Sequence, residues 1–499
     1  MAAALVTAWV AASDKRGGLM PTLPVTAALL YVPVCLSAVH SALHLLLLAA
    51  GGTRVWGEDA WREGRLLAGR GGVVSTLALA VFAALAVIGA PLAFAIGLGA
   101  MAALAWGGFD LVVLPQRMMF AVSSFPLMAI PLFMLAGELM VKAGIVDRLV
   151  DLATSLVGRV QGGMANVTII AGTVFASVSG AAVASASALG STLVPALRRT
   201  YPDGYSSAVV ASAANLGPVI PPSNAMIVYA LTAGSSVSVG GLVMAGIVPG
   251  LLLMLGFMAL ATLTARRRGY TLSGEPFSAR GALRETRRAG LILTMPVIVV
   301  GGIVGGVFTA TEGAAIAVVY ALLVGLLVTR RLKLSDLPGC LFRAAVMAAM
   351  VGALIAFASV VTFVFTLDLV PMRLSGLIEG LAATPLAFIL LVMAMLLVVG
   401  MLIESNAAYI MLVPLFAPMA LGYGIDPLFF GFLFMYNLVV GMMTPPVGVL
   451  LFVMSGITRV PMSVLTREVV PFVALQFAVL GLCVAFPGLV LWLPRAMGY

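Results

Sequence analysis

The sequence predicts an all-α polytopic membrane protein with an inverted repeat, two re-entrant helical hairpins and two broken transmembrane helices. Three observations lead to this fold class. The 499 residues are 62% hydrophobic and only 9% charged, with a mean hydropathy of +1.18, far above an ordinary soluble domain. Two long apolar segments each contain adjacent prolines. The basic residues cluster in short connections between apolar runs, which indicates membrane topology.

The proline pairs predict two helices that stop and restart within the membrane. Pro221–Pro222 lies in the stretch NLGPVIPPSNA, and Pro445–Pro446 lies in MTPPVG. Proline lacks a backbone donor and clashes with the preceding turn, so a helix is interrupted there. The alternative for either pair alone is a simple kink, which membrane helices tolerate. Two pairs at matching places in the two halves favour true breaks.

The arginines fix how the apolar segments cross the membrane. Seven arginines lie between residues 266 and 288, which predicts a cytoplasmic connection, and the basic residues near 198, 330 and 459 should lie on the same side. These placements agree only if two segments do not cross and are re-entrant hairpins, 164–197 opening to the cytoplasm and 385–420 opening outward. The apolar segments are 73–107, 125–141, 164–197, 205–235, 240–265, 289–308, 310–329, 340–368, 385–420, 427–457 and 469–494.

The spacing of these features predicts an internal repeat. The hairpin tips Gly180 and Glu404 are as far apart in the chain as the two proline pairs. Five crossings separate the two broken helices, and because this number is odd the copies should be inverted. We therefore expect a first half at 73–265, a cytoplasmic basic loop at 266–288 and a second half at 289–499. Residues 51–72 are expected to form an interfacial linker.

Hairpin tips and helix breaks should expose unpaired backbone groups at mid-membrane, where carbonyl ends favour a small hard cation and helix N-termini favour an anion. Paired breaks of this kind indicate the binding site of a transporter. The candidate substrate- and ion-binding residues are Ser177, Ser179, Gly180, Asn215, Gly217, Pro218, Pro221, Pro222 and Ser223 in the first copy, and Glu404, Ser405, Asn406, Asn437, Gly441, Thr444, Pro445 and Gly448 in the second.

Three acidic residues lie at membrane level. Glu404, at the second tip, is interpreted as a cation ligand, with a helix-capping acceptor and an exposed loop residue as alternatives. Glu138 is expected to pair with Lys142 four residues later on one helix. Glu312 is expected to cap a helix together with Thr309.

The sequence lacks an enzyme constellation and a Walker motif, so we expect no enzyme and no direct use of ATP. An ion gradient should supply the energy. The net charge of +9 reflects topology and does not indicate nucleic-acid binding.

Several segments resemble the large membrane subunit of tripartite ATP-independent periplasmic (TRAP) transporters, from about Val73 to the C-terminus. They are FPLMAIPLFMLAGELM (125–140), SVSGAAVASASALGS (177–191), NLGPVIPPSNAMIVYA (215–230), VFTATEGAA (307–315) and GMMTPPVGVLLFV (441–453). Residues 13–50 resemble the last helix of the small membrane subunit, which implies that 1–50 is a remnant of that subunit fused at the N-terminus.

The resemblance implies an elevator-type symporter of the bacterial or archaeal inner membrane. A sodium gradient would drive import of an organic acid, a carboxylate such as a C4-dicarboxylate or a sugar acid, delivered by a periplasmic substrate-binding protein. Sodium is the only coupling ion implied, with no other cofactor. A small membrane subunit, fused or separate, would be a partner. The positions that match the family's sodium sites are Ser179, Gly180, Gly217, Pro221, Glu404, Asn406, Gly441, Thr444 and Pro445.

The chain also departs from the family pattern at three places. Ser185 stands where an aspartate is usual, Glu404-Ser405-Asn406 replaces Asp-Pro-Thr, and Leu450 stands where an asparagine is common. These differences bear on the sodium stoichiometry and leave proton coupling open. Two alternative functions are a binding-protein-independent organic anion transporter and, in another class, a channel or membrane scaffold.

Overall fold

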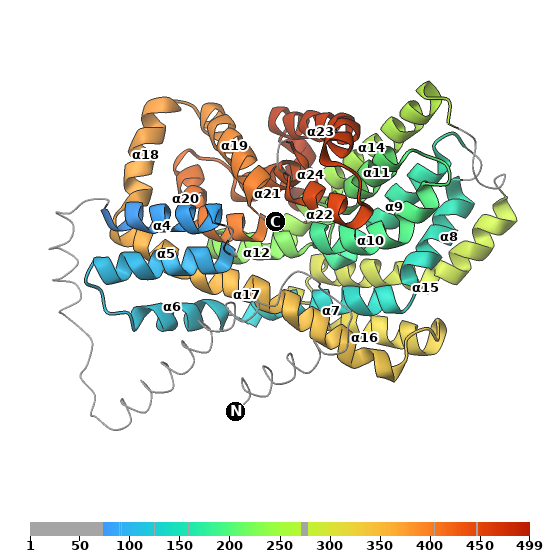
Figure 1. The fold of residues 1–499 in the computed structure, drawn as a ribbon, viewed down its shortest axis with the longest axis horizontal. Coiled ribbons are helices and arrows are strands. Elements are labelled where there is room, and N and C mark those ends of the chain that lie inside the picture. Colours follow the sequence, from blue (N-terminus) through green and yellow to red (C-terminus); the bar gives the residue numbers. More distant parts are fainter. Residues whose placement is uncertain are drawn as a thin grey trace.

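The structure is a computed structural model that describes residues 73–499 except 89, 91, 124, 158–159, 271–277, 404 and 446–447. The expectations for residues 1–50 and 51–72 lie outside the described residues. The described part consists of helices and turns without a β-strand. Figure 1 shows its helices arranged around a centre where α12, α21 and α22 come together. The predicted all-α fold class is confirmed.

Helices of the first half precede a hairpin and a broken helix. The leading elements are α4 (Val73–Val87), α5 (Leu92–Trp106), α6 (Val113–Val122), the 3₁₀ turn Phe125–Met128, α7 (Ala129–Lys142) and α8 (Ile145–Val157). The hairpin is α9 (Gly163–Ser179) with α10 (Ala182–Leu197), and the broken helix is α11 (Asp203–Asn215) with α12 (Asn224–Ala233). The 3₁₀ turn Gly234–Ser236, α13 (Val239–Ala245) and α14 (Ile247–Arg267) follow.

The second half repeats this order. Its leading elements are α15 (Ala279–Val304), α16 (Ala310–Leu323) with a π-helical end (Val324–Val328), the 3₁₀ turn Leu334–Asp336, α17 (Leu337–Leu367) and α18 (Val370–Leu381). The hairpin is α19 (Pro385–Leu402) with α20 (Ser405–Gly422), and the broken helix is α21 (Pro427–Met443) with α22 (Val449–Thr458). The chain ends with α23 (Met462–Ala485) and α24 (Gly488–Ala496).

The second helix of each hairpin packs against the broken helix of the other half. The hairpin and broken helices of the second half follow their first-half counterparts at an interval of about 224 residues, the separation of the bonded residues Asn215 and Val439. The hairpin helix α10 packs against α22, and its counterpart α20 packs against α12. This reciprocal packing is the property of a two-fold axis, so the predicted repeat is present. The counterparts are α4 and α15, α5 and α16, α7 and the end of α17, α8 and α18, α9 and α19, α10 and α20, α11 and α21, α12 and α22, and α14 and α23.

Helix lengths distinguish full spans from half spans. Among the described residues, five helices are long and apolar enough to cross a membrane: Val239–Arg267, Ala310–Val328, Leu334–Leu367, Ser405–Gly422 and Met462–Ala485. The pair Val113–Val122 and Pro126–Lys142, bent by 66°, makes a possible sixth. Most other apolar helices have 10–17 residues and include three of the four parts of the broken helices, α12, α21 and α22, and three of the four hairpin helices. The membrane side on which each hairpin opens stays a prediction.

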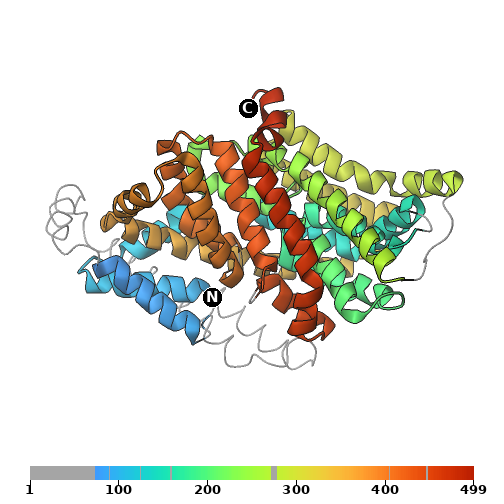
Figure 2. The same cartoon turned by 90° about the horizontal axis from the view of Figure 1, so that it is seen from above.

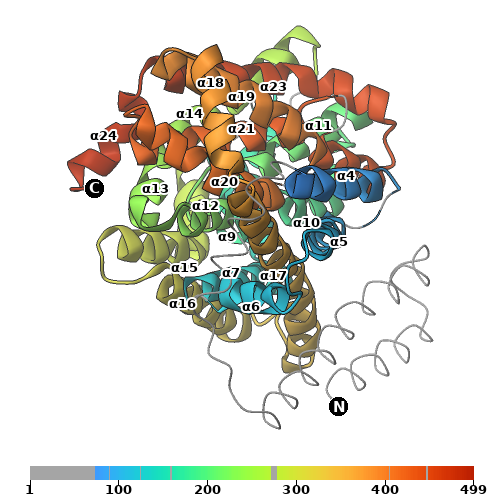
Figure 3. The same ribbon diagram turned by 90° about the vertical axis from the view of Figure 1, so that its left-hand side faces the viewer.

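The core lies along the first parts of the broken helices. All residues of α11 from Gly204 to Asn215, and all of α21 from Phe429 to Met443, are buried. Figure 2 shows α21 and α23 side by side across the middle of the molecule, and Figure 3 places α6, α7, α15 and α16 on one side of the hairpin helices. A helix buried on every face packs within a bundle, so the breaks lie at the protein interior.

Several segments differ from the sequence prediction. The segment 73–107 is two helices, because Gly89 and Pro91 stand between α4 and α5. The expected loop 266–288 is helical from Ala279, where the Ser278 hydroxyl caps α15 by accepting from the Gly281 amide at 3.3 Å. The segment 469–494 begins earlier, at Met462, and divides before Gly488. Helices α6, α8 and α18 lie outside the predicted apolar segments and were missed. Of these, α8 and α18 are amphipathic, and apolar runs do not reveal amphipathic helices.

Candidate functional site

The first hairpin tip packs directly on the first helix break. Gly180 ends α9 in the left-handed conformation, with φ +63°, which glycine adopts without strain. A Cβ atom on Gly180 would lie 2.6 Å from the amide nitrogen of Asn224, the first residue of α12. A Cβ atom on Gly217 would lie 2.7 Å from the carbonyl oxygen of Ala176 on α9. Both glycines therefore permit backbone contact between tip and break.

The first break leaves carbonyl oxygens unpaired. Among the described residues, none donates a hydrogen bond to the carbonyl oxygens of Gly217, Val219 or Pro221. The Pro218 carbonyl accepts instead from the Ser223 hydroxyl at 2.7 Å. Pro218, Pro221, Pro222 and Ser223 are all buried. Buried oxygens without a donor are the groups that a hard cation such as sodium takes as ligands.

The second hairpin contacts its break at equivalent positions. A Cβ atom on Gly441 would lie 2.8 Å from the backbone of Gly400 on α19, and one on Gly400 would lie 2.9 Å from the Leu438 carbonyl oxygen. Gly448, with φ +61°, donates its amide to the Met401 carbonyl at 3.1 Å. Gly400 and Gly441 follow Ala176 and Gly217 by the interval that separates Asn215 from Val439, 224 residues. The repeat therefore extends to individual backbone contacts.

Equivalent residues also meet where the broken helices cross. The Asn215 amide donates to the Val439 carbonyl at 3.0 Å and to Gln476 Oε1 at 3.1 Å. Asn215 Oδ1 is buried and has no partner among the described residues. Gln476 Nε2 in turn lies 3.3 Å from the Met443 sulfur. This buried network joins α11, α21 and α23.

Other candidate side chains bond to nearby backbone. Ser177 Oγ donates to the Val174 carbonyl at 2.9 Å, and Thr444 Oγ1 donates to the Val440 carbonyl at 2.6 Å. Asn437 Nδ2 donates to Met393 on α19 at 2.6 Å, which holds the second hairpin against its break. The carbonyl of Thr444 accepts no hydrogen bond from the described residues. Backbone oxygens, more than side chains, are thus the available ligands.

The remaining candidates are only partly described. Glu404 lies outside the described residues, and of Ser179 only the backbone, at the end of α9, is described. Ser405, which is buried, and Asn406 begin α20, and Pro445 follows the end of α21. The structure thus places two clusters of candidate residues, one in each repeat, where a hairpin tip meets a helix break.

Sequence reasoning missed two buried polar residues that bear on the site. Gln476 is fully buried, and its Oε1 accepts a hydrogen bond from Asn215. A single polar amide side chain within an apolar span is the sequence signal that could have revealed it. Ser185, noted only as a family departure, is fully buried in α10, and its hydroxyl has no partner among the described residues. Leu450, another of the three departures, is also fully buried, on the neighbouring helix α22.

The two acidic residues outside the tips have structural partners. Glu138 is bound by Arg343, whose Nε donates to Glu138 Oε2 at 2.6 Å, so the expected pair with Lys142 is wrong. Lys142 lies instead 4.0 Å from Asp336. Arg343 replaces Lys142 as the partner of Glu138 because α17, which carries Arg343, packs against α7. The capping role of Glu312 is confirmed, since its carboxylate accepts from the Thr309 amide at 2.8 Å.

Comparison with known proteins identifies the family. Residues 79–489 match the model described as "Tripartite ATP-independent periplasmic transporter, DctM component". The isethionate TRAP transporter permease protein of Oleidesulfovibrio alaskensis is 38% identical over 410 residues, which are 82% of this chain and 64% of that protein. The C4-dicarboxylate TRAP large permease of Pseudomonas aeruginosa is 37% identical, covering 75% of this chain and 87% of that one. The sialic acid TRAP large permease of Vibrio cholerae is 35% identical, covering 77% and 90%.

Solved transporter structures share the fold. The YdaH transporter of Alcanivorax borkumensis matches with a TM-score of 0.57 at 17% identity, over 77% of this chain and 90% of that chain. The chain spans 64% of the isethionate protein's length, and the family match begins at residue 79. The protein is an integral inner-membrane component of a transporter and not an enzyme, and the five membrane-length apolar helices among its described residues agree with this. The chain belongs to the DctM-component family, the large membrane subunits of TRAP transporters.

Proposed function

We propose that this protein imports an organic acid by sodium-gradient-driven symport, using an elevator movement of its hairpin-bearing core. A periplasmic substrate-binding protein would deliver the acid, and a small membrane subunit, fused at residues 1–50 or separate, would complete the scaffold. The observation that supports this function best is the pair of tip-and-break clusters, which are equivalent under the two-fold repeat and carry unpaired buried carbonyls. Such paired discontinuous helices are where secondary transporters bind substrate and coupling ion.

Sodium suits the chemistry of these clusters. It would be held by backbone oxygens near Gly217 and Pro221 in the first copy and near Gly441 and Thr444 in the second, with Ser179, Glu404 and Asn406 contributing from the tips. The ligand atoms would be oxygens, which a hard cation prefers. A bound cation would also offset the cost of burying the unpaired carbonyls. When the ion leaves, the buried carbonyl oxygens are again unpaired and their burial is again unfavourable. Ion binding is therefore coupled to the packing of the hairpin tip against the helix break.

An anionic substrate suits the helix starts at the same place. Helices α10, α12, α20 and α22 all begin at a tip or a break, and a helix N-terminus stabilises negative charge. The relatives are named for isethionate, sialic acid, C4-dicarboxylates and 2,3-diketo-L-gulonate, all of them organic acids. We infer an organic acid as the substrate class for this chain.

Uptake into proteoliposomes tests the function. Purified protein with its small subunit should accumulate radiolabelled acid only when the cognate binding protein is outside and sodium is higher outside than inside. Uptake that continues with the binding protein omitted would favour the binding-protein-independent alternative. Uptake that is unchanged when choline replaces sodium would overturn sodium coupling, and flux without saturation would indicate a channel.

Glu404→Gln is expected to raise the sodium concentration for half-maximal uptake about tenfold. The substitution removes a charged ligand while keeping its size, and the loss should be comparable to that of a hydrogen bond to a charged group, roughly 1.5–3 kcal/mol. Glu312→Gln is the matched control, because it removes an equal charge from a residue whose capping role a glutamine retains. Equal sodium dependence in both variants would exclude Glu404 from the ion site.

A further inference from the structure

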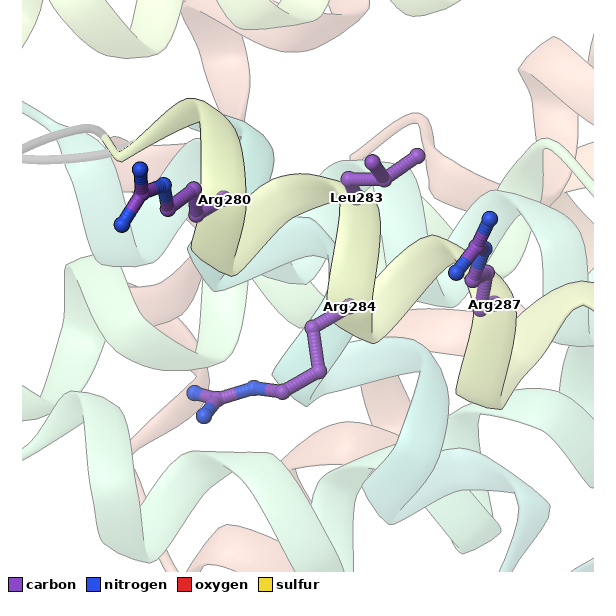
Figure 4. Close-up of a pocket in the computed structure, with 4 residues that line it drawn as sticks. All are labelled: Arg280, Leu283, Arg284 and Arg287. Carbon is purple, nitrogen blue, oxygen red and sulfur yellow. The ribbon is translucent and has the colours of Figure 1, made fainter.

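Helix α15 is basic in its first turns and apolar in its later part. Its first turns carry Arg280, Arg284 and Arg287, whose spacing of four and three residues places them on one face. Its later part, Thr294–Val304, is apolar. We call the three arginines with Leu283 the α15 arginine face. Figure 4 shows these four side chains extending from the same helix.

The positive charge of the α15 arginine face is not balanced within the described residues. Arg280 and Arg287 have no acidic partner there, and Arg284, 68% exposed, lies 3.4 Å from Glu285. Glu285 is only 15% exposed and lies toward α8, where partial burial and the charge of Glu285 raise the pKa of Asp151. Glu285 and Asp151 therefore lie between α15 and α8. Arg284 pairs with Glu285 but stays largely exposed, and the guanidinium groups of Arg280 and Arg287 remain available to an external anion.

The α15 arginine face adjoins a run of exposed apolar residues. Leu283, Leu291 and Val297 on α15 are 58%, 50% and 70% exposed. Exposed apolar residues thus continue from the basic turns into the apolar part of the helix. Arginine side chains at such a junction can lay their aliphatic stems on the apolar surface and place their charge among lipid headgroups. The cytoplasmic position predicted for these arginines agrees with this arrangement.

The shape of the α15 arginine face favours several phosphate groups over one small anion. The four side chains line a shallow hollow of about 400 Å³. Figure 4 shows the guanidinium groups spread along the helix and pointing in different directions. A single phosphate ion is held best by converging donors, whereas a membrane surface offers many phosphates side by side.

We propose that the α15 arginine face binds the phosphate groups of anionic phospholipids in the cytoplasmic leaflet and anchors this side of the protein to the membrane surface. This interaction lies outside the transport site and does not depend on the proposed substrate or coupling ion.

Native mass spectrometry of the full-length protein, titrated with phosphatidylglycerol or phosphatidylethanolamine, tests the proposal. Arg280→Gln/Arg284→Gln/Arg287→Gln should weaken phosphatidylglycerol binding at least about tenfold, since each basic residue near an anionic surface contributes about 1 kcal/mol, or about fivefold. Phosphatidylethanolamine binding should not change. The matched triple lysine variant keeps the charge and should stay within about threefold of wild type.

Three results would overturn the proposal. The first is equal phosphatidylglycerol binding by the wild-type and glutamine proteins, and the second is an equal loss of both lipids in the glutamine protein. Inorganic phosphate competing as strongly as phosphatidylglycerol would indicate a small-anion site instead. If the triple glutamine variant does not fold, Arg287→Gln alone should still weaken phosphatidylglycerol binding about fivefold, and an unchanged affinity in that variant would equally contradict the proposal.

Discussion

Gly441→Ala is expected to abolish substrate uptake while the protein still inserts into the membrane. The new Cβ would lie 2.8 Å from the backbone of Gly400 and 3.1 Å from the Leu397 carbonyl oxygen, so α19 must move away from α21. The displaced atoms belong to backbone, which cannot yield as a flexible side chain does. Overpacking of this kind costs about 1–3 kcal/mol. Displacing the second hairpin would also separate its tip from the break, so uptake should fall by more than about a hundredfold, measured as initial rate per inserted protein.

Gly456→Ala is the matched control for this substitution. Gly456 lies in α22, just beyond the same break, and a Cβ atom there meets nothing within 4 Å. Alanine within a helix is favoured over glycine by about 1 kcal/mol, so this variant should be active and equally or more stable. Gly217→Ala, against the Ala176 carbonyl, should reproduce the loss in the first repeat. Wild-type uptake by Gly441→Ala would mean that close docking of hairpin and break is not required.

The elements that form the site could be predicted because proline and small polar residues interrupt apolar runs. Both hairpins and both breaks lie where the sequence places them, since Pro221–Pro222 and Pro445–Pro446 prevent a helix from continuing whatever its surroundings. Helices α8 and α18 escaped prediction because they are short and amphipathic. Their assignment depends on packing against neighbours that the sequence does not specify.

The atoms that form the site were harder to predict than its position. Asn215, Asn437 and Thr444 were chosen for their polar side chains, yet each of these side chains donates to a backbone carbonyl. The contacts of Gly217 with Ala176 and of Gly441 with Gly400 depend on how a hairpin docks, which no local pattern encodes. Glu138 shows the same limit, because a helix pair contributes only about 0.2–0.5 kcal/mol and a tertiary arginine replaces it.

Ser185→Asp is expected to make the protein's stability strongly sodium-dependent. Ser185 is fully buried near the start of α10, and its hydroxyl has no partner among the described residues. A carboxylate there would be buried without a charge partner, which costs several kcal/mol unless a cation binds or a proton is taken up. In choline chloride the variant should unfold at a lower temperature than wild type. Sodium should reverse the loss, since a ligand present at a hundred times its Kd stabilises by about 2.7 kcal/mol.

Ser185→Asn separates charge from shape in the same experiment. Asparagine has the size of aspartate but no negative charge, so it should lower the unfolding temperature equally in sodium and in choline. If aspartate and asparagine respond alike to sodium, no cation site lies beside Ser185, and the serine is then a packing residue. If only the aspartate variant is rescued, the first repeat retains a cation cradle made of backbone oxygens. The wild-type protein would then bind sodium in that cradle more weakly than a relative with the carboxylate, because charge rather than geometry is missing.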